Sequence, residues 1–399
     1  LSTSEWASPL VLVPKKDGGL RVCVDFRRLN ALTKRDNYDI GNVMDLLARM
    51  GRSKIFSTLD GDSAFLHIKM TPESQPMTAF TSPFGCYEFP RMPFGLAGAP
   101  QTYAKLVARV LEGIPYSQAL PFLDDCAVHS RTLEEHFIAL EGVLEAYRRA
   151  GIRLKPSKCQ LFSSRIRFLG HYVDERGIHV DPKYVELVAN WPEPTTRKEV
   201  RIFMGKASYY RRFVKGFAHV AGPLMNRLQQ VEGVGDNDPF TLTEEERASF
   251  HRLQWGLSHA PILALPDFSR EAAPLVLDTD YSAENAAIGG VLSQHQDGLE
   301  RVILYASLRL SPSQTTYTSF KGELFAGITM MNRMKYYLLG RRFVWRTDCG
   351  ALTQVGTMEP PNGLIGRWME ILANYDFKVL HRAGKLHGNA DAASRAMHT

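Results

Sequence analysis

Short apolar runs separated by polar turns open the chain and predict strands. Residues 10–13 and 20–24 are two such runs, joined by a basic, turn-rich tip at residues 15–19, a pattern typical of a β-hairpin. Residues 54–60 predict another strand, which ends on Asp60.

Helical spacing of apolar residues then predicts two helices with clear ends. Pro100 opens the first and Gly113 follows its end, as these residues do at helix boundaries. Thr132 and Glu135 form a capping box for the second, which ends at Gly151. Strands and helices mixed in this way predict an α+β domain with an antiparallel sheet backed by helices. The second helix has one apolar face: Leu133, Phe137, Leu140, Leu144 and Tyr147.

A second capping box, Thr196 with Glu199, opens a basic helical region. Its cations interleave with aromatic residues, which suits phosphate contacts and base stacking. The alternative is an aromatic core with a solvated basic face, and both can hold together. Residues 151–230 carry 15 Lys and Arg against 6 Asp and Glu, so we expect a polyanion to be gripped there. The interleaved residues are Arg197, Lys198, Arg201, Phe203, Lys206, Tyr209, Tyr210, Arg211, Arg212, Phe213 and Lys215.

A third region starts near Ala273 and reads as three strands, a helix and a further strand, the order of a mixed α/β domain. The strands are 274–279, 289–292, 301–307 and 342–348, and the helix is 320–339.

Composition is that of an ordinary soluble globular protein of two or three domains, with 399 residues, 44% hydrophobic and 23% charged. No apolar run of membrane-spanning length and no secretory leader is found. Five scattered cysteines without a Cys-x-x-Cys pair argue against a zinc site or disulfide framework and favour a reducing compartment. Because the chain begins at Leu1, we expect it to be a piece of a longer polypeptide.

Two adjacent acids, Asp124 and Asp125, lie inside the apolar stretch 119–128. Burying two carboxylates side by side is costly unless they are neutralised or bind a metal. A hairpin there, together with Asp60, would place three acids on neighbouring strands, enough to hold two Mg²⁺ ions for phosphoryl transfer. A solvated Asp-Asp turn is the alternative.

The third region also carries acids beside its predicted elements: Asp280, Glu323, Asp348 and Asp391, the last in a short C-terminal helix. Each alone would be an ordinary surface acid, but together they resemble a second two-Mg²⁺ site.

Other residues near the first acids suit a nucleotide. Phe65 follows Asp60 by five residues, and its ring could lie under a sugar and exclude a 2′-hydroxyl; the alternative is a core phenylalanine. Lys15, Lys16 and Arg21 could clamp a triphosphate, or form a solvated hairpin tip. Residues 91–96 predict a loop whose main chain lies against a ligand.

Ordered motifs over nearly the whole chain resemble the reverse transcriptase–ribonuclease H region of gypsy-type LTR retrotransposon Pol polyproteins, and more distantly that of retroviruses. These motifs are Trp6-Ala7-Ser8-Pro9, Lys15-Lys16-Asp17-Gly18, residues 21–30 (RVCVDFRRLN), Met92-Pro93-Phe94-Gly95-Leu96, Phe122-Leu123-Asp124-Asp125, Phe168-Leu169-Gly170-His171, residues 209–213 (YYRRF), residues 263–268 (LALPDF) and residues 390–395 (ADAASR).

The resemblance implies an α+β polymerase right hand with fingers, palm and thumb, followed by a mixed α/β ribonuclease H-like domain. The expected divisions are 1–172 for N-terminally truncated fingers and palm, 173–268 for the thumb and connecting segment, and 269–399 for the ribonuclease H-like domain. The implied activity is RNA-directed, and also DNA-templated, DNA polymerisation with cleavage of RNA in RNA–DNA hybrids. The rival interpretation is a degenerate or domesticated fragment that binds nucleic acid without catalysis.

The resemblance also assigns roles to residues. It implies Mg²⁺, with Mn²⁺ as an alternative, on Asp60, Asp124 and Asp125 and on Asp280, Glu323, Asp348 and Asp391. Substrate-binding residues would be Lys15, Lys16, Arg21, Phe65 as the steric gate, Phe94 and Gly95; the primer grip would be Phe168, Leu169, Gly170 and His171. Asp278 lies on the same strand face as Asp280, but the Thr-Asp-x-Ser match favours Asp280. His381 resembles a loop histidine that assists product departure.

The chain departs from relatives at three aromatic positions: Phe122 and Phe65 replace tyrosines, and Phe94 replaces a retroviral glutamine. An aromatic gate should still exclude ribose. Expected partners are an RNA template, a DNA primer, an RNA–DNA hybrid, dNTPs and the neighbouring protease and integrase domains of Pol, with no membrane. The expected location is intracellular, in cytoplasmic virus-like particles.

Overall fold

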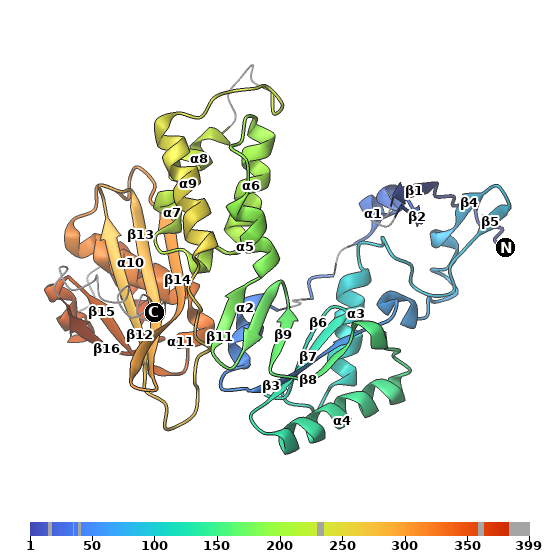
Figure 1. Ribbon diagram of the computed structural model, residues 1–399, viewed down its shortest axis with the longest axis horizontal. Helices are drawn as coiled ribbons and strands as arrows, with labels where there is room; N and C mark the ends of the chain where they lie inside the picture. The colour runs from blue at the N-terminus through green and yellow to red at the C-terminus, as the bar shows by residue number, and fades with distance from the viewer. Residues whose placement is uncertain (15–17, 35, 39–40, 230–234, 358–362, 383–399) are drawn as a thin grey trace. The chain divides into compact units, whose positions relative to one another are not determined.

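The computed structural model describes residues 1–14, 18–34, 36–38, 41–229, 235–357 and 363–382. The chain forms two compact units, Leu1–Phe168 and Leu169–Thr399 (Figure 1). The predicted three-part division at 172/173 and 268/269 stays a prediction.

The N-terminal unit begins with the predicted hairpin. Strand β1 (Leu10–Pro14) pairs antiparallel with β2 (Leu20–Val24), with Leu10 opposite Val24. Two short helices follow, α1 (Arg27–Leu32) and α2 (Val43–Arg49), and a second hairpin joins β4 (Phe80–Ser82) to β5 (Gly85–Tyr87).

A four-stranded sheet in the order β6-β7-β3-β8 forms the centre of this unit. Its strands are β3 (Ile55–Asp60), β6 (Ala119–Phe122), β7 (Asp125–Ser130) and β8 (Gln160–Ser163), and β9 (Arg165–Phe168) ends the unit. Helices α3 (Ala99–Val110) and α4 (Leu133–Ala150) pack against the sheet (Figure 1). The shared core includes Leu59, Tyr103, Val107, Val128 and Val143. The predicted antiparallel sheet backed by helices is therefore confirmed.

The predicted buried face of α4 is partly wrong, although its capping box from Thr132 forms. Leu140 and Tyr147 are buried, but His136 also points inward because hydroxyls satisfy both of its ring nitrogens. Ser57 Oγ lies 2.7 Å from His136 Nε2 and Ser130 Oγ lies 2.8 Å from Nδ1. A histidine with both nitrogens paired can occupy a core position. The expected face residues that are instead exposed are Leu133, Phe137 and Leu144.

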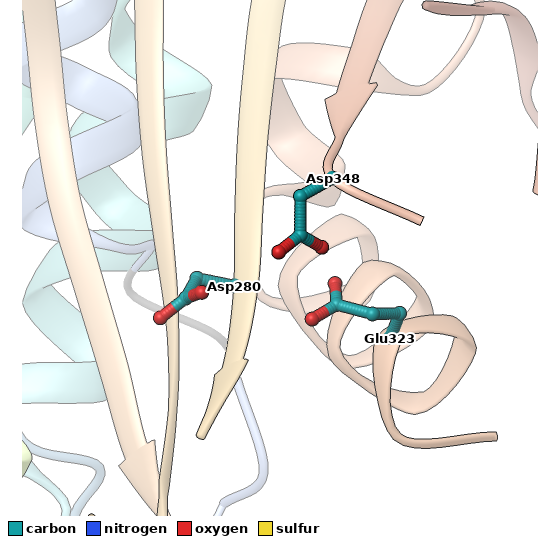
Figure 2. A group of neighbouring side chains, drawn as sticks. All are labelled: Asp280, Glu323 and Asp348. Carbon is teal, nitrogen blue, oxygen red and sulfur yellow. The ribbon is translucent and has the colours of Figure 1, made fainter. Parts of the chain in front are cut away.

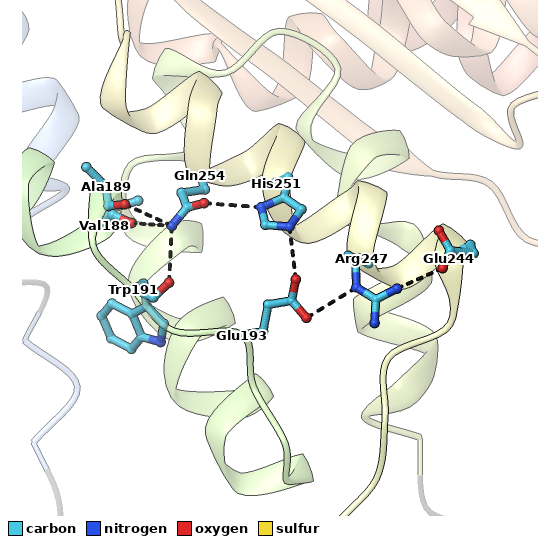
Figure 3. A network of polar contacts seen from close by, with 8 residues as sticks. All are labelled: Val188, Ala189, Trp191, Glu193, Glu244, Arg247, His251 and Gln254. Atoms are coloured by element: carbon cyan, nitrogen blue, oxygen red, sulfur yellow. Dashed lines mark hydrogen bonds and ion pairs between the residues drawn. The ribbon is translucent and has the colours of Figure 1, made fainter.

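The C-terminal unit starts with a hairpin of β10 (His171–Asp174) and β11 (Gly177–Val180), followed by helices. The helices are α5 (Pro182–Ala189), α6 (Arg197–Tyr209), α7 (Phe217–Val220), α8 (Gly222–Arg227) and α9 (Glu244–Ser258). Gln254 of α9 donates hydrogen bonds to three carbonyl oxygens at the end of α5, on Val188, Ala189 and Trp191 (Figure 3). Since the last carbonyls of a helix lack helical partners, these bonds fix the two helices together.

A five-stranded mixed sheet follows, in the order β14-β13-β12-β15-β16. β12, β13 and β14 are antiparallel neighbours, whereas β15 runs parallel to β12 and to β16. The strands are β12 (Leu275–Ser282), β13 (Ala287–Gln296), β14 (Leu299–Arg309), β15 (Arg342–Thr347) and β16 (Asp376–His381). The predicted mixed α/β domain is confirmed, with β16 as an additional strand.

Helix α10 (Ser319–Arg333) lies very close to this sheet because two of its residues are glycines. A Cβ on Gly327 would come within 2.1 Å of the Trp345 ring, and one on Gly322 within 2.4 Å of Tyr281. The expected single helix 320–339 is broken at Met334, after which α11 (Lys335–Leu338) begins; α12 (Leu364–Leu372) precedes β16.

All five cysteines are free thiols. Among the described residues, no helix has both the length and the apolar character needed to cross a bilayer.

Candidate active sites

Asp60 and Asp125 face each other across one rung of the central sheet. Asp60 is the last residue of β3 and Asp125 the first of β7, and their Cα positions pair directly. Asp124 lies in the tight turn between β6 and β7, where Leu123 adopts a left-handed φ of 56° and the Asp124 carbonyl accepts from Gly61 N at 3.0 Å. The hairpin therefore brings all three predicted acids to one end of the sheet.

The charges at this end of the sheet repel one another. Burial, and then the charges of Asp124 and Asp60, raise the pKa of Asp125 to about 6. Lys158, which ends the short helix η3 (Pro156–Lys158), partly offsets this by pairing with Asp60, with its Nζ at 3.0 Å from Oδ2. No sequence pattern singles out Lys158, since the pair joins residues far apart in the chain.

Phe65 fits both interpretations that the sequence left open. It lies in the short helix η1 (Ala64–His67), packs partly against the core and contacts Tyr103, with ring centroids 6.0 Å apart. Its other neighbour is the exposed Phe94, at 5.1 Å. Two residues predicted to bind the nucleotide thus touch each other.

The loop that carries Phe94 is held by Asn30, the last residue of the motif at residues 21–30, to which the sequence assigned no role. Asn30 donates to the Gly95 carbonyl at 2.8 Å and accepts from Ala97 N at 2.8 Å. Gly95 has a φ of +97°, a conformation that favours glycine. Arg21 is exposed on β2, whereas Lys15 and Lys16 lie outside the described residues.

The predicted primer grip forms a tight turn between β9 and β10. Leu169 and Gly170 have φ values of 48° and 70°. Tyr209 Oη donates to the Leu169 carbonyl at 2.7 Å, and Tyr210 Oη donates to the Gly170 carbonyl at 2.5 Å. His171 is fully buried, burial lowers its pKa to about 4, and its Nδ1 lies 2.8 Å from the Leu169 carbonyl oxygen. Phe168 is also buried.

Helix α6 presents both a core face and an open face. Phe203, Tyr210 and Phe213, the last two just beyond the helix, are buried as the core interpretation predicted, whereas Tyr209 is 44% exposed. On the open face, a Cβ added to Gly205 would meet no atom within 4 Å, and this glycine lies one turn from Arg201 and one turn from Tyr209. Two cations expected at the surface, Arg197 and Arg212, are instead buried.

A second group of acids converges in the C-terminal unit. Asp280 belongs to β12, Glu323 to α10, and Asp348 directly follows β15. Their ligand oxygens all lie within 4.8 Å of one another, and Glu323 and Asp348 turn their carboxylates toward each other (Figure 2). Over the described ranges this is the one acidic group that meets that limit; the Asp60 group does not. Asp391 lies outside the described residues.

Glu323 is the most perturbed acid of this group. It accepts a hydrogen bond from Tyr281 N at 2.9 Å, yet burial, with the charges of Asp348 and Asp280, raises its pKa to about 8. Asp278 differs, because Arg346 donates to it at 2.5 Å. His381 Nε2 lies 3.0 Å from the Asp348 carbonyl oxygen, beside the acids.

Known families match both units. A family described as "Reverse transcriptase (RNA-dependent DNA polymerase)" matches residues 13–173, and an "RNase H-like domain found in reverse transcriptase" matches residues 270–375. The chain is 34% identical to the Retrovirus-related Pol polyprotein from transposon 297 of Drosophila melanogaster, over 99% of this chain and 36% of that protein. It is 30% identical to the Transposon Tf2-3 polyprotein of Schizosaccharomyces pombe, over 98% of this chain and 29% of that protein. The chain thus spans about a third of these relatives.

Solved structures share the fold. A foamy viral protease-reverse transcriptase dRH in complex with double-stranded DNA matches 96% of this chain and 66% of its own, with a TM-score of 0.82 and 23% identity. The same viral protein with an RNA/DNA hybrid gives a TM-score of 0.79 at 23% identity, over 96% of this chain and 51% of that one. The predicted polymerase fold followed by a ribonuclease H-like domain is confirmed. The chain belongs to the reverse transcriptase–ribonuclease H region of gypsy-type LTR retrotransposon Pol polyproteins.

Proposed function

We propose that the chain is an RNA-directed DNA polymerase, able also to copy DNA, joined to a ribonuclease H that degrades the RNA of RNA–DNA hybrids. One observation carries the proposal: each matched domain gathers acids at one place. Asp60 and Asp125 pair across the first sheet, and Asp280, Glu323 and Asp348 converge beside the second.

Divalent cations, Mg²⁺ or Mn²⁺, fit both groups of acids. Burial raises the pKa of Asp125 and of Glu323, and the neighbouring carboxylates add to both shifts, so a bound cation would favour the charged forms. Carboxylate oxygens are the ligands that Mg²⁺ prefers. Asp60, Asp124 and Asp125 would hold the ions of the polymerase, and Asp280, Glu323 and Asp348, with Asp391, those of the ribonuclease. Bound ions of this kind activate an attacking oxygen and stabilise the charge of the leaving oxygen.

The residues around the first acids would position the nucleotide. Phe65, braced by Tyr103 and touching Phe94, offers an aromatic wall against the 2′ position of the sugar. Asn30 would keep the loop at Gly95 in the shape that this contact requires. Lys15, Lys16 and Arg21 would contact the triphosphate. Catalysis then depends mainly on positioning and on electrostatic complementarity.

The primer grip and α6 would hold the nucleic acid. The turn at Leu169 and Gly170 is fixed by two tyrosine hydroxyls, so it can support a primer end. The open surface of α6 at Gly205 would let a nucleic-acid backbone approach closely, with Tyr209 on one side and Arg201, which a phosphate would have to share with Asp236, on the other. Arginine suits phosphate contacts and tyrosine suits stacking. The foamy viral proteins of the same fold hold double-stranded DNA and an RNA/DNA hybrid.

The second site would cut the RNA strand, recognised by its 2′-hydroxyls and by the shape of the hybrid. His381, next to Asp348, would assist product departure. These activities would serve retrotransposon replication in virus-like particles, beside the protease and integrase domains of the parent polyprotein.

The proposal is tested by incubating the full chain with a primed RNA template, dNTPs and Mg²⁺. We expect primer extension that stops when the metal is chelated. Binding of the template without any extension, in Mg²⁺ or Mn²⁺, would instead support a fragment that binds nucleic acid without catalysis.

A further inference from the structure

Lys158 lies over the carboxylate of Asp60. Its Nζ is 3.0 Å from Oδ2 and 3.2 Å from Oδ1, so the ammonium contacts both oxygens. Both carboxylate oxygens of Asp60 are therefore occupied by the ammonium of Lys158.

The backbone fixes this placement. The segment before Lys158 is tied to the end of β3, since Lys155 N donates to the Asp60 carbonyl at 2.9 Å and Asp62 N donates to the Arg153 carbonyl at 2.8 Å. Pro156 then begins the short helix η3, which ends at Lys158. The lysine is therefore anchored close to Asp60, while its side chain stays 55% exposed and able to swing away.

The charges around Lys158 explain why an ammonium stays there. A lysine is charged at neutral pH, and the Asp60 carboxylate, which is 18% exposed, holds the ammonium at 3.0 Å.

We propose that Lys158 is a built-in counter-cation of the polymerase site, and that a divalent metal ion must displace it from Asp60 to bind. The inference rests on the proposed function, because it takes Asp60 as a metal ligand. Two cations cannot share the same carboxylate oxygens without repulsion. Lys158 therefore weakens metal binding to the free protein, so that full loading depends on the extra oxygen ligands that phosphates bring.

The test is Mn²⁺ binding, followed by the electron paramagnetic resonance signal of free Mn²⁺, without nucleic acid or dNTP. The full chain carries Glu323→Gln and Asp348→Asn to silence the second site. In this parent, Lys158→Gln should bind Mn²⁺ about three- to fivefold more tightly, the scale of removing a partly exposed ion pair. Lys158→Arg keeps the charge and should bind as the parent does. Lys155→Gln, a change at an exposed lysine of the same loop, should also leave the affinity unchanged.

Unchanged or weaker Mn²⁺ binding in Lys158→Gln would overturn the inference. A further variant of the same parent, Asp124→Asn with Asp125→Asn, separates this failure from that of the proposed function. If neither the parent nor Lys158→Gln binds more Mn²⁺ than this variant, the polymerase metal site itself is absent and both proposals fall. If the parent binds Mn²⁺ and Lys158→Gln does not differ from it, only the role of Lys158 falls.

Discussion

At the scale of single residues, the acids could be found from the sequence but their supporting partners could not. Asp124 and Asp125 stand out because two carboxylates interrupt an apolar stretch. Lys158 and Asn30 do not, because their partners are 98 and 65 residues away and no local pattern links them. The metal-ligand assignments themselves stay predictions.

Glu323 makes the stability of the metal-free protein depend on pH. Its pKa is raised from the ordinary 4.5 to about 8, so the folded state favours the protonated form. The stability that the protonated Glu323 contributes to the folded state is fully present below pH 4.5 and is lost as the pH rises through about 8. Glu323→Gln should remove this loss and unfold at a higher temperature than the parent at pH 9.

Thermal unfolding in a chelator, from pH 5 to pH 9, measures the effect of Glu323→Gln. Each kcal/mol added to the free energy of unfolding should raise the thermal unfolding midpoint by about 2–4 °C in a unit of this size. If raising the pH from 5 to 9 lowers the unfolding midpoint of the parent no more than that of the variant, ionisation of Glu323 costs the folded state nothing.

Phe65 gives a prediction about sugar selection. Phe65→Val shortens the wall beside Phe94, so ribonucleotides should be incorporated about 10–100-fold more efficiently relative to dNTPs, as expected for opening space in a selective pocket. Primer extension with rNTPs and with dNTPs measures the ratio. An unchanged ratio with intact dNTP incorporation would leave Phe65 as a core residue only.

At the scale of elements, helix ends were easier to predict than helix faces. The capping boxes at Thr132 and Thr196 form as expected, because they depend on residues three apart. The buried face of α4 depends instead on Ser57 and on Ser130, which make an inward histidine possible. The strands β4 and β5, with three residues each, lacked a pattern long enough to be recognised. The strand β16 was missed although it is as long as β15.

Alanine at each of two helical glycines should change the stability of the protein in opposite directions. Gly327→Ala should destabilise the protein by about 1–3 kcal/mol or more, because the new Cβ would collide with Trp345. Gly205→Ala should instead stabilise it by about 0.5–1 kcal/mol, since Gly205 is in open space and alanine favours helix.

Denaturant unfolding measures both changes, and a binding titration with an RNA–DNA hybrid adds a second readout for Gly205→Ala. If α6 contacts nucleic acid as proposed, this more stable variant should bind the hybrid more weakly. Equal binding would remove Gly205 from the nucleic-acid surface.

At the scale of the whole molecule, the C-terminal unit joins helices and the five-stranded sheet into one compact body. Arg211 donates to the Ser307 carbonyl of β14 at 2.6 Å, and Ala218 N donates to Ser307 Oγ at 2.8 Å. The resemblance implies a boundary at 268/269, but the sequence carries no signal of these contacts. The order of motifs, by contrast, was enough to predict both folds.

The central claim is that two separate groups of acids carry two separate reactions. Asp124→Asn and Asp348→Asn are matched changes, each removing one charge from one group. Primer extension on an RNA template and cleavage of an RNA–DNA hybrid, run on both variants, test the claim directly. Asp124→Asn should lose extension by at least about 100-fold while cleaving the hybrid normally, and Asp348→Asn should do the reverse. Loss of both activities in each variant would contradict independent sites.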